Sequence, residues 1–202
     1  MSDTPAKTLQ GTKTLLNLMR AFSGESQARN RYTFYAAVAR KAGYKQIEAI
    51  FLETAENELD HAKQFYRLLA KYLGATEPVM VDLQGTYPIA LGETRDNLLA
   101  AAAGEREEWS TLYPDFAETA QQEGFADVAA MFRIILSIEQ HHDKRFAKLA
   151  ANLAGNAVFC REQPVFWKCI KCGYVVEALK APEICPGCKH PQAYFEILAE
   201  NY

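Results

Sequence analysis

Two pairs of ionisable residues stand where a buried helix face should be apolar. Glu58 and His61 are three residues apart, and Glu139 and His142 repeat this pair 81 positions later. Each pair interrupts a helical stripe of mainly apolar residues, which in the first copy is Ile47, Phe51, Thr54, Glu58, His61, Phe65, Leu68 and Tyr72. Because an unpaired carboxylate in a core is unstable or becomes protonated, each pair needs a partner there.

Two further carboxylates complete a metal-binding pattern. Glu25 and Glu105 lie at matching positions, each in the segment that precedes a Glu-x-x-His pair. One glutamate from each of two helices, together with a Glu-x-x-His from each of the other two, is the ligand set of di-iron and di-manganese bundles. Carboxylate and imidazole donors suit iron or manganese. A single Glu-x-x-His more often has an ordinary structural role, but its recurrence on two matching stripes favours metal ligation.

An internal repeat organises the first 155 residues. Segment 21–32 matches segment 101–112 at a spacing of 80, and after a one-residue offset Gly43 falls on Gly124 at a spacing of 81. The pattern predicts four helices, at about 13–41, 45–73, 93–122 and 126–154, joined in pairs by tight glycine turns. About 20 residues separate the second helix from the third, enough to span a helix roughly 45 Å long. This favours a ferritin-like four-helix bundle with a long crossover, in which Pro114 should kink the third helix unless the helix is broken there.

Four of the five cysteines form a second candidate metal site. They make two C-x-x-C pairs separated by 12 residues: Cys169, Cys172, Cys185 and Cys188. Four thiolates at this spacing provide a tetrahedral site for zinc or for a single iron, and so short a segment needs such a staple to fold. Cys160 lies outside both pairs, and we expect a small buried or free thiol. His141, beside His142, is expected at the surface.

The composition is that of an ordinary globular protein. The 202 residues are 49% hydrophobic and 23% charged, with a formal net charge of -3 and a pI near 5.9. This balance gives no general attraction to nucleic acid or to an anionic membrane. The polar opening and the lack of a long apolar run predict neither a signal peptide nor a membrane span, so we expect a cytoplasmic protein. In that reducing compartment the C-x-x-C pairs favour metal over disulfides.

A seventh candidate ligand gives the bundle a resemblance to a known family. Glu108 lies one helical turn after Glu105, where the first half of the repeat has Ala28. With this extra glutamate the bundle resembles rubrerythrin, and the CGY and CP segments at the cysteine pairs resemble rubredoxin. The resemblance covers nearly the whole chain. It implies a mainly α fold, with a ferritin-like di-iron four-helix bundle over residues 1–160 and a small, β-rich, rubredoxin-like domain with iron at its four cysteines over residues 161–202.

The resemblance also implies an activity and roles for the ligands. In the family a diferrous centre reduces hydrogen peroxide to water and becomes diferric, and an FeS4 centre returns electrons one at a time. On this chain Glu58 and Glu139 would bridge the two irons of an oxo- and carboxylate-bridged centre. Glu25 and Glu105 would be terminal ligands, and His142 would bind the second iron.

Four further residues receive roles from the same resemblance. The first iron would move between Glu108 and His61 as the redox state changes. Tyr32 and Tyr113 match family positions that hydrogen-bond ligand carboxylates, which orients the ligands and tunes the metal; a tyrosine at the core edge is the alternative. The expected catalytic set is therefore Glu58, Glu139, Glu108, His61, Tyr32 and Tyr113.

The expected partners also come from the family. They are hydrogen peroxide, an external electron donor such as rubredoxin or an NAD(P)H-dependent reductase, and a second copy of the chain, in a homodimer where the tail of one subunit docks on the bundle of the other. Lys189 stands where rubredoxin usually has glycine, which leaves a structural zinc site as an alternative for the tail.

Two other functions compete with the peroxidase. An iron-handling protein would oxidise and store iron as ferritin does, but Glu108 and an electron-carrying tail argue against it. A regulatory protein with zinc in the tail and a vestigial bundle site is the other alternative, and the complete ligand set argues against it.

Overall fold

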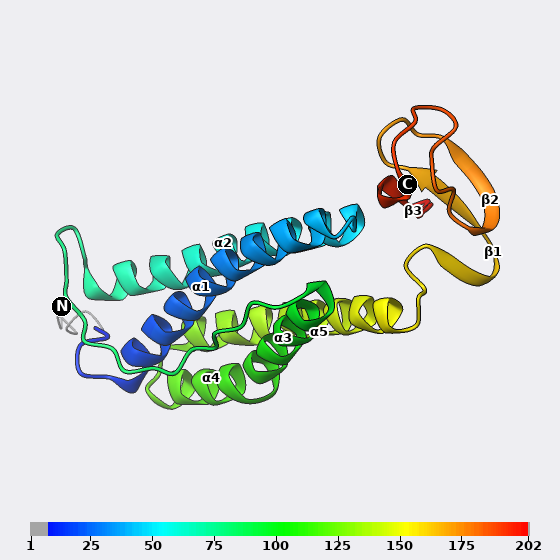
Figure 1. Cartoon of the computed structure of the whole chain (residues 1–202). Coiled ribbons are helices and arrows are strands. Elements are labelled where there is room, and N and C mark those ends of the chain that lie inside the picture. The colour runs from blue at the N-terminus through cyan, green and yellow to red at the C-terminus, as the bar shows by residue number, and fades with distance from the viewer. Residues whose placement is uncertain (1–7, 202) are drawn as a thin grey trace. The chain divides into compact units, whose positions relative to one another are not determined.

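The computed structural model describes residues 8–201, which form helices followed by a small sheet (Figure 1). The helices are α1 (Lys13–Lys41), α2 (Lys45–Leu73), α3 (Thr94–Glu107), the π-helix η1 (Glu108–Leu112), α4 (Tyr113–Gln122) and α5 (Ala126–Ala154). The C-terminal part contains β1 (Cys160–Cys169), β2 (Val175–Lys180), the short 3-10 helix η2 (Gln192–Tyr194) and β3 (Phe195–Ile197). Among the described residues, no helix combines the length and the apolar character that a membrane crossing requires.

Glycine turns set the ends of the helix pairs. Gly43 and Gly124 have φ values of +83° and +79°, a left-handed conformation that glycine adopts without steric cost. In each turn the next amide reaches back to the helix: Tyr44 N donates to Ala39 O at 2.9 Å, and Phe125 N donates to Ala120 O at 2.7 Å. The helices predicted at 13–41, 45–73 and 126–154 are confirmed at these bounds.

The third predicted helix, 93–122, is not a single α-helix. It consists of α3, η1 and α4, and Tyr113 N donates to Glu108 O, the i to i−5 bond of a π-helix. Pro114 therefore begins a new α-helix, where a missing N–H does least harm, instead of kinking a continuous one. The π-helix also accounts for the offset of the repeat. Glu25 and Glu105 are 80 residues apart but Tyr32 and Tyr113 are 81 apart, so the extra residue falls in this stretch.

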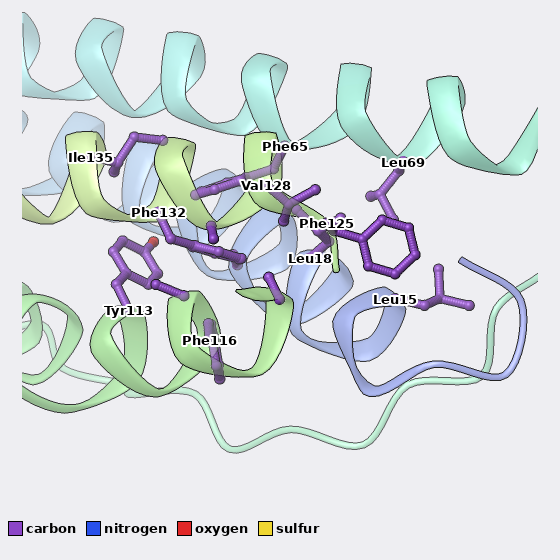
Figure 2. Close-up of a cluster of buried hydrophobic side chains, with 14 of the residues drawn as sticks. Leu15, Leu18, Phe65, Leu69, Tyr113, Phe116, Phe125, Val128, Phe132 and Ile135 are labelled. Atoms are coloured by element: carbon purple, nitrogen blue, oxygen red, sulfur yellow. The ribbon is translucent and has the colours of Figure 1, made fainter. Parts of the chain in front are cut away.

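The chain forms two compact units. The first contains the described chain up to Arg31, together with Thr54–Ile89 and Ala103–Asp143. Its core is a cluster of apolar side chains from several helices (Figure 2). The ring of Phe65 on α2 lies 4.9 Å from that of Phe132 on α5 and 5.8 Å from that of Tyr113 on α4. This packing fixes the helices that carry the candidate ligands.

The second unit contains Tyr32–Glu53, Ala90–Ala102 and the chain from Lys144 onward. Within its helical part, the rings of Tyr32, Tyr35, Phe51 and Phe146 form an aromatic cluster, with centroids 5.2–6.2 Å apart. Both units hold part of the long connection between α2 and α3. In the first, Arg20 Nε donates to Gln84 O at 3.0 Å, and in the second, Tyr35 Oη donates to Ala90 O at 2.9 Å. The connection therefore follows α1, as the predicted crossover requires.

The C-terminal sheet is antiparallel, with strand order β2-β1-β3. Trp167 on β1 pairs with Val176 on β2 and with Ile197 on β3. The core of the sheet is small: Trp167, Cys169, Ala181, Cys185 and Phe195. Two of these five residues are cysteines of the candidate metal site, so a metal there would be part of the core.

Candidate metal centres

Four helices bring six candidate ligands together inside the first unit. Glu25 comes from α1, Glu58 and His61 from α2, Glu105 from α3, and Glu139 and His142 from α5, and all six are buried. Their donor atoms fall into two groups, each with all its atoms within 4.8 Å of one another. One group is Glu25, Glu58, His61 and Glu139; the other is Glu58, Glu105, Glu139 and His142. The two groups share Glu58 and Glu139.

The two imidazoles face the shared carboxylates through the same ring nitrogen. Nδ1 of His61 lies 2.9 Å from Oε2 of Glu58 and 2.9 Å from Oε1 of Glu139. Nδ1 of His142 lies 2.7 Å from Oε2 of Glu139 and 3.3 Å from Oε1 of Glu58. Each histidine nitrogen therefore meets one carboxylate from its own helix and one from the other helix, which is how a bridging pair of glutamates would be placed.

The donor set fits two divalent cations. One Nδ1–H can donate to only one acceptor at a time, so two imidazoles cannot satisfy four carboxylates. Oε2 of Glu25 and Oε1 of Glu58 are buried and accept no hydrogen bond within the described chain. Ligands on opposite sides of an ion at about 2.1 Å are about 4.2 Å apart, which agrees with groups of this size. Cations would satisfy these orphaned oxygens and neutralise the cluster.

The electrostatics of the protein alone point the same way. Burial, and next the charge of Glu58, raise the pKa of Glu25 to about 7, and burial with the charges of Glu58 and Glu105 raises that of Glu139. Burial opposes the charged form of His142, but the surrounding carboxylates of Glu105, Glu139 and Glu58 raise its pKa to about 12. The carboxylates therefore stabilise cations between them, and metal ions would take over this role.

Glu108 lies beside the two groups but belongs to neither. It is the first residue of η1, and a Cβ placed on Gly24 would lie 3.7 Å from Glu108 Oε1. Burial raises the pKa of Glu108 well above the usual glutamate value, and the charges of Glu25 and Glu105 raise it further. The Glu108 carboxyl group is thus close enough to the site for the ligand charges to raise its pKa, although it lies outside both four-residue groups.

The two predicted tyrosines have different surroundings. Tyr113 is buried and its hydroxyl donates to Oε1 of Glu25, so the sequence pointed to a direct contact with a candidate ligand. Burial, and next the charge of Glu108, raise the pKa of Tyr113, which keeps this donor protonated. Tyr32 is buried in the aromatic cluster of the second unit, and its predicted hydrogen bond to a ligand stays a prediction.

One interaction beside the site was not predicted from the sequence. Asp143 is buried and follows His142 on α5. It accepts hydrogen bonds from Arg106 Nε at 3.1 Å, Arg106 Nη2 at 3.0 Å and Trp109 Nε1 at 3.0 Å. These bonds hold α3 and the start of η1 against α5. A sequence cue existed, since a carboxylate beside a candidate ligand needs a partner if it is buried. His141 is exposed, as expected.

The four paired cysteines also meet. Their sulfur atoms form one group within 4.8 Å, with Sγ of Cys169 3.7 Å from that of Cys188 and Sγ of Cys172 3.6 Å from that of Cys185. Burial opposes ionisation of Cys185, but the backbone N–H groups of Cys188 and Gly187 lower its pKa to about 7. A thiol that ionises easily is a good metal ligand.

The backbone around the cysteines explains the unusual lysine. Gly173 N donates to Cys169 O and Lys189 N donates to Cys185 O, so each C-x-x-C pair closes with the same turn. Gly173 has φ +79° and Lys189 has φ +63°, a left-handed conformation that favours glycine. Lys189 therefore adopts the left-handed backbone conformation that this turn requires, although it is not glycine, and this costs some strain. Cys160 is an exposed free thiol outside this group.

Comparisons with known proteins agree with both sites. The family model described as Rubrerythrin matches residues 17–150, and that described as Rubrerythrin, rubredoxin-like domain, matches residues 167–196. Rubrerythrin-1 of Clostridium acetobutylicum is 57% identical over 97% of this chain and 100% of its own length. Rubrerythrin of Porphyromonas gingivalis is 49% identical over 97% of this chain and 95% of its own. A solved structure of nigerythrin in its fully reduced, all-ferrous state matches with a TM-score of 0.60 and 30% identity, over 96% of this chain and 94% of that one.

Fold and site together define a ferritin-like helical protein with a carboxylate–histidine metal site, followed by a rubredoxin-like metal-binding domain. The match extends over both parts of the chain. The chain belongs to the rubrerythrin family. The predicted family and fold class are therefore confirmed.

Proposed function

We propose that this protein is a non-haem di-iron peroxidase that reduces hydrogen peroxide to water, with electrons delivered through its four-cysteine iron domain, and that it protects the cell against oxidative stress. The observation that carries the proposal is the pair of ligand groups that share Glu58 and Glu139, with Glu108 alongside, on a chain that also has a four-cysteine site. Membership of the rubrerythrin family and the likeness to an all-ferrous nigerythrin support iron in both sites.

The metals would be held by the two groups described above, bridged by Glu58 and Glu139 with Glu25 and Glu105 as terminal ligands, and by the four cysteines. Bound ferrous ions would supply the two electrons that cleavage of the O–O bond consumes. Carboxylate and imidazole donors also accept manganese, and four thiolates also accept zinc, so iron content must be measured.

The protein's own groups would orient the ligands and hold protons. Because Tyr113 donates to Oε1 of Glu25, the other oxygen, Oε2, would remain available to bind a metal. His61 lies inside the first ligand group while Glu108 lies outside it, which supports His61 as the ligand in one state and Glu108 in the other. Glu108 has a raised pKa, so when it is not a ligand its carboxyl group can carry a proton beside the site.

The proposal extends to partners. Hydrogen peroxide is the substrate, and an external donor such as rubredoxin or an NAD(P)H-dependent reductase would reduce the iron held by the four cysteines. We propose a homodimer in which the tail of one subunit docks on the bundle of the other. A cytoplasmic location would suit four cysteines that must stay reduced to bind metal.

The test is anaerobic stopped-flow absorbance on iron-loaded, fully reduced protein mixed with stoichiometric hydrogen peroxide. We expect rapid ferric absorption from the bundle, followed by the appearance of the ferric-thiolate chromophore as the iron of the four-cysteine site is oxidised. Glu58→Ala should abolish the reaction and leave the ferric-thiolate spectrum of the tail intact. A slow response to peroxide with a fast response to oxygen and added ferrous iron would instead identify an iron-handling protein of the ferritin type.

A further inference from the structure

A cavity of about 540 Å³ lies in the first unit beside the carboxylate–histidine site. Its lining includes Glu108 and Tyr113, the latter bonded to Glu25. Much of the remaining wall is apolar, with Leu112 and Phe116 among its residues. Cavities that hold small organic molecules measure about 300–1,000 Å³, so this one is large enough for a ligand with a hydrocarbon part.

Glycines open and shape the cavity. Gly104 lines it, and a Cβ added there would meet no atom within 4 Å, so open space reaches the backbone of α3. The connection between α2 and α3 also lines the cavity, and there a Cβ on Gly85 would lie 2.8 Å from Cε2 of Tyr87. The absence of a side chain at Gly85 therefore lets the Tyr87 ring fold against the backbone at the cavity wall.

Two donor atoms of wall residues lie beneath the cavity surface and lack acceptors. The hydroxyl of Tyr87 and Nη1 of Arg31 are buried and have no hydrogen-bond partner within residues 8–201. Buried donors without acceptors destabilise a protein, and a ligand that brings an oxygen acceptor would relieve this if the Tyr87 or Arg31 side chain turned to expose its donor. The cavity thus combines apolar surface, unsatisfied donors and contact with Glu108.

We propose that this cavity binds organic hydroperoxides with a short alkyl or aryl tail, which are then reduced at the adjacent site. The tail would pack on Leu112 and Phe116, and the peroxy group would lie toward Glu108, with the side chain of Tyr87 or Arg31 turning to donate to it. Hydrogen peroxide has only two heavy atoms and leaves most of this volume unused.

The reaction extends the proposed function and rests on it. ROOH takes two electrons and two protons and gives ROH and H2O: the O–O bond breaks and two O–H bonds form. The electrons would come from two ferrous ions held by the ligand groups described above, each giving one electron, and the protons would come from solvent.

Binding can be tested without turnover. Full-length protein with zinc in the bundle is titrated with cumyl alcohol, the reduction product of cumene hydroperoxide, and followed by calorimetry and NMR. We expect saturable binding that Tyr87→Phe weakens about fivefold and Gly104→Leu weakens about tenfold or more. Gly104→Ala is the matched control and should bind within about twofold of the parent. Binding that is absent, that is equal in all four proteins, or that inorganic phosphate displaces at equal concentration would overturn the proposal.

Turnover separates this proposal from the previous one. With iron-loaded protein, Gly104→Leu should lower kcat/KM for cumene hydroperoxide by about tenfold relative to kcat/KM for hydrogen peroxide in the same variant. Activity with hydrogen peroxide but none with cumene hydroperoxide in the parent protein would refute the organic substrate alone. Activity with neither would refute the peroxidase, and the zinc-form titration would still decide whether the cavity binds the alcohol.

Discussion

At the scale of single residues, the site depends most on the carboxylates that both ligand groups use. Glu58 and Glu139 belong to both groups, while Glu25 and Glu105 belong to one each. Losing a shared carboxylate removes a donor from two metal positions and leaves each buried imidazole with only one of its two nearest carboxylates. Losing an unshared one removes a donor from one position only.

This difference predicts unequal metal contents. In Glu58→Ala both bundle ions should be lost on dialysis, whereas Glu105→Ala should lose the ion of its own group and retain the other with affinity lowered by about 10- to 100-fold. Metal analysis after dialysis measures this, and the metal bound by the four cysteines in the same sample serves as the internal reference. Equal losses in the two variants would contradict separate ligand groups.

A second single residue, Glu123, stabilises the fold away from the candidate metal site. Glu123, at the end of α4, accepts bonds from Lys13 N at 3.0 Å, Thr14 N at 2.8 Å and Thr14 Oγ1 at 2.6 Å, and so caps the N-terminus of α1. Burial opposes its ionisation, but the Thr14 hydroxyl and the two amides lower its pKa. The charged form is therefore stabilised by folding.

Glu123→Gln should lower the free energy of unfolding at pH 7 by about 1 kcal/mol. The pKa of Glu123 is lower in the folded state than in the unfolded state. The wild-type protein therefore has its full excess in free energy of unfolding at pH values above the unfolded pKa, and this excess disappears as the pH falls through the folded pKa. Urea unfolding of both proteins across this range measures the gap. Glu118→Gln, on the exposed face of α4, is the control and should stay within about 0.5 kcal/mol. A gap that stayed constant down to low pH would exclude the cap.

At the scale of elements, the π-helix between α3 and α4 is the main structural difference between the two halves of the helical repeat. It adds one residue to the helix and begins at Glu108, and the indole of Trp109 within it bonds to Asp143 on α5. The helices before and after it keep their apolar faces toward the core, with Leu98 and Ala101 buried in α3 and Phe116 and Ala120 buried in α4. The extra residue is therefore accommodated within the π-helix and does not rotate the flanking helices.

Deleting one residue from the π-helix should be tolerated. Removing the exposed Ser110 should convert this stretch to an ordinary α-helix and lower Tm by only a few degrees. Removing the exposed Ala103 instead turns the preceding part of α3 by about 100° and takes Leu98 and Ala101 out of the core. We expect a much larger loss of Tm for that control. Thermal melts followed by circular dichroism compare the two deletion variants. Equal losses of Tm would show that η1 does not accommodate the extra residue of the repeat.

The sequence predicted the approximate bounds of three helices, which the structure confirms, because periodic apolar faces and glycine turns mark their ends. It showed the one-residue offset but did not locate the π-helix, since backbone hydrogen bonding leaves no period of its own in five residues. The ligand pairs Glu58-x-x-His61 and Glu139-x-x-His142 were predictable because each interrupts an apolar stripe. The contact of Asp143 with Trp109 and the donors of the cavity depend on neighbours distant in sequence, which no local pattern specifies.

At the scale of the whole molecule, two metal-binding parts of different construction share one chain. The helical part has a large apolar core of its own, whereas the sheet has a core of five residues, two of them cysteines. So small a core depends on its metal for folding. The tail should therefore unfold when its metal is lost, while the helices remain.

Cys172→Ser tests this dependence together with the proposed electron route. The exposed thiol at this position can be replaced without disturbing the core, yet the tail should lose its metal. Far-UV circular dichroism should keep its helical signal, steady-state peroxide reduction with an external donor should stop, and a single oxidation of prereduced bundle iron should survive. Unchanged steady-state turnover would show that electrons bypass the tail.

The one-residue offset has a consequence for ancestry. The two halves of the helical region differ in length by one codon, and the extra codon of the second half falls between those for Glu105 and Tyr113. An ancestor without it would have carried two like hairpins, each giving one glutamate and one Glu-x-x-His to a symmetric centre. The copy with the extra codon has glutamate at 108 where the other has Ala28. Apart from this codon the two halves offer the same glutamate and Glu-x-x-His donors, so the difference between the two candidate metal positions lies in the segment that carries it.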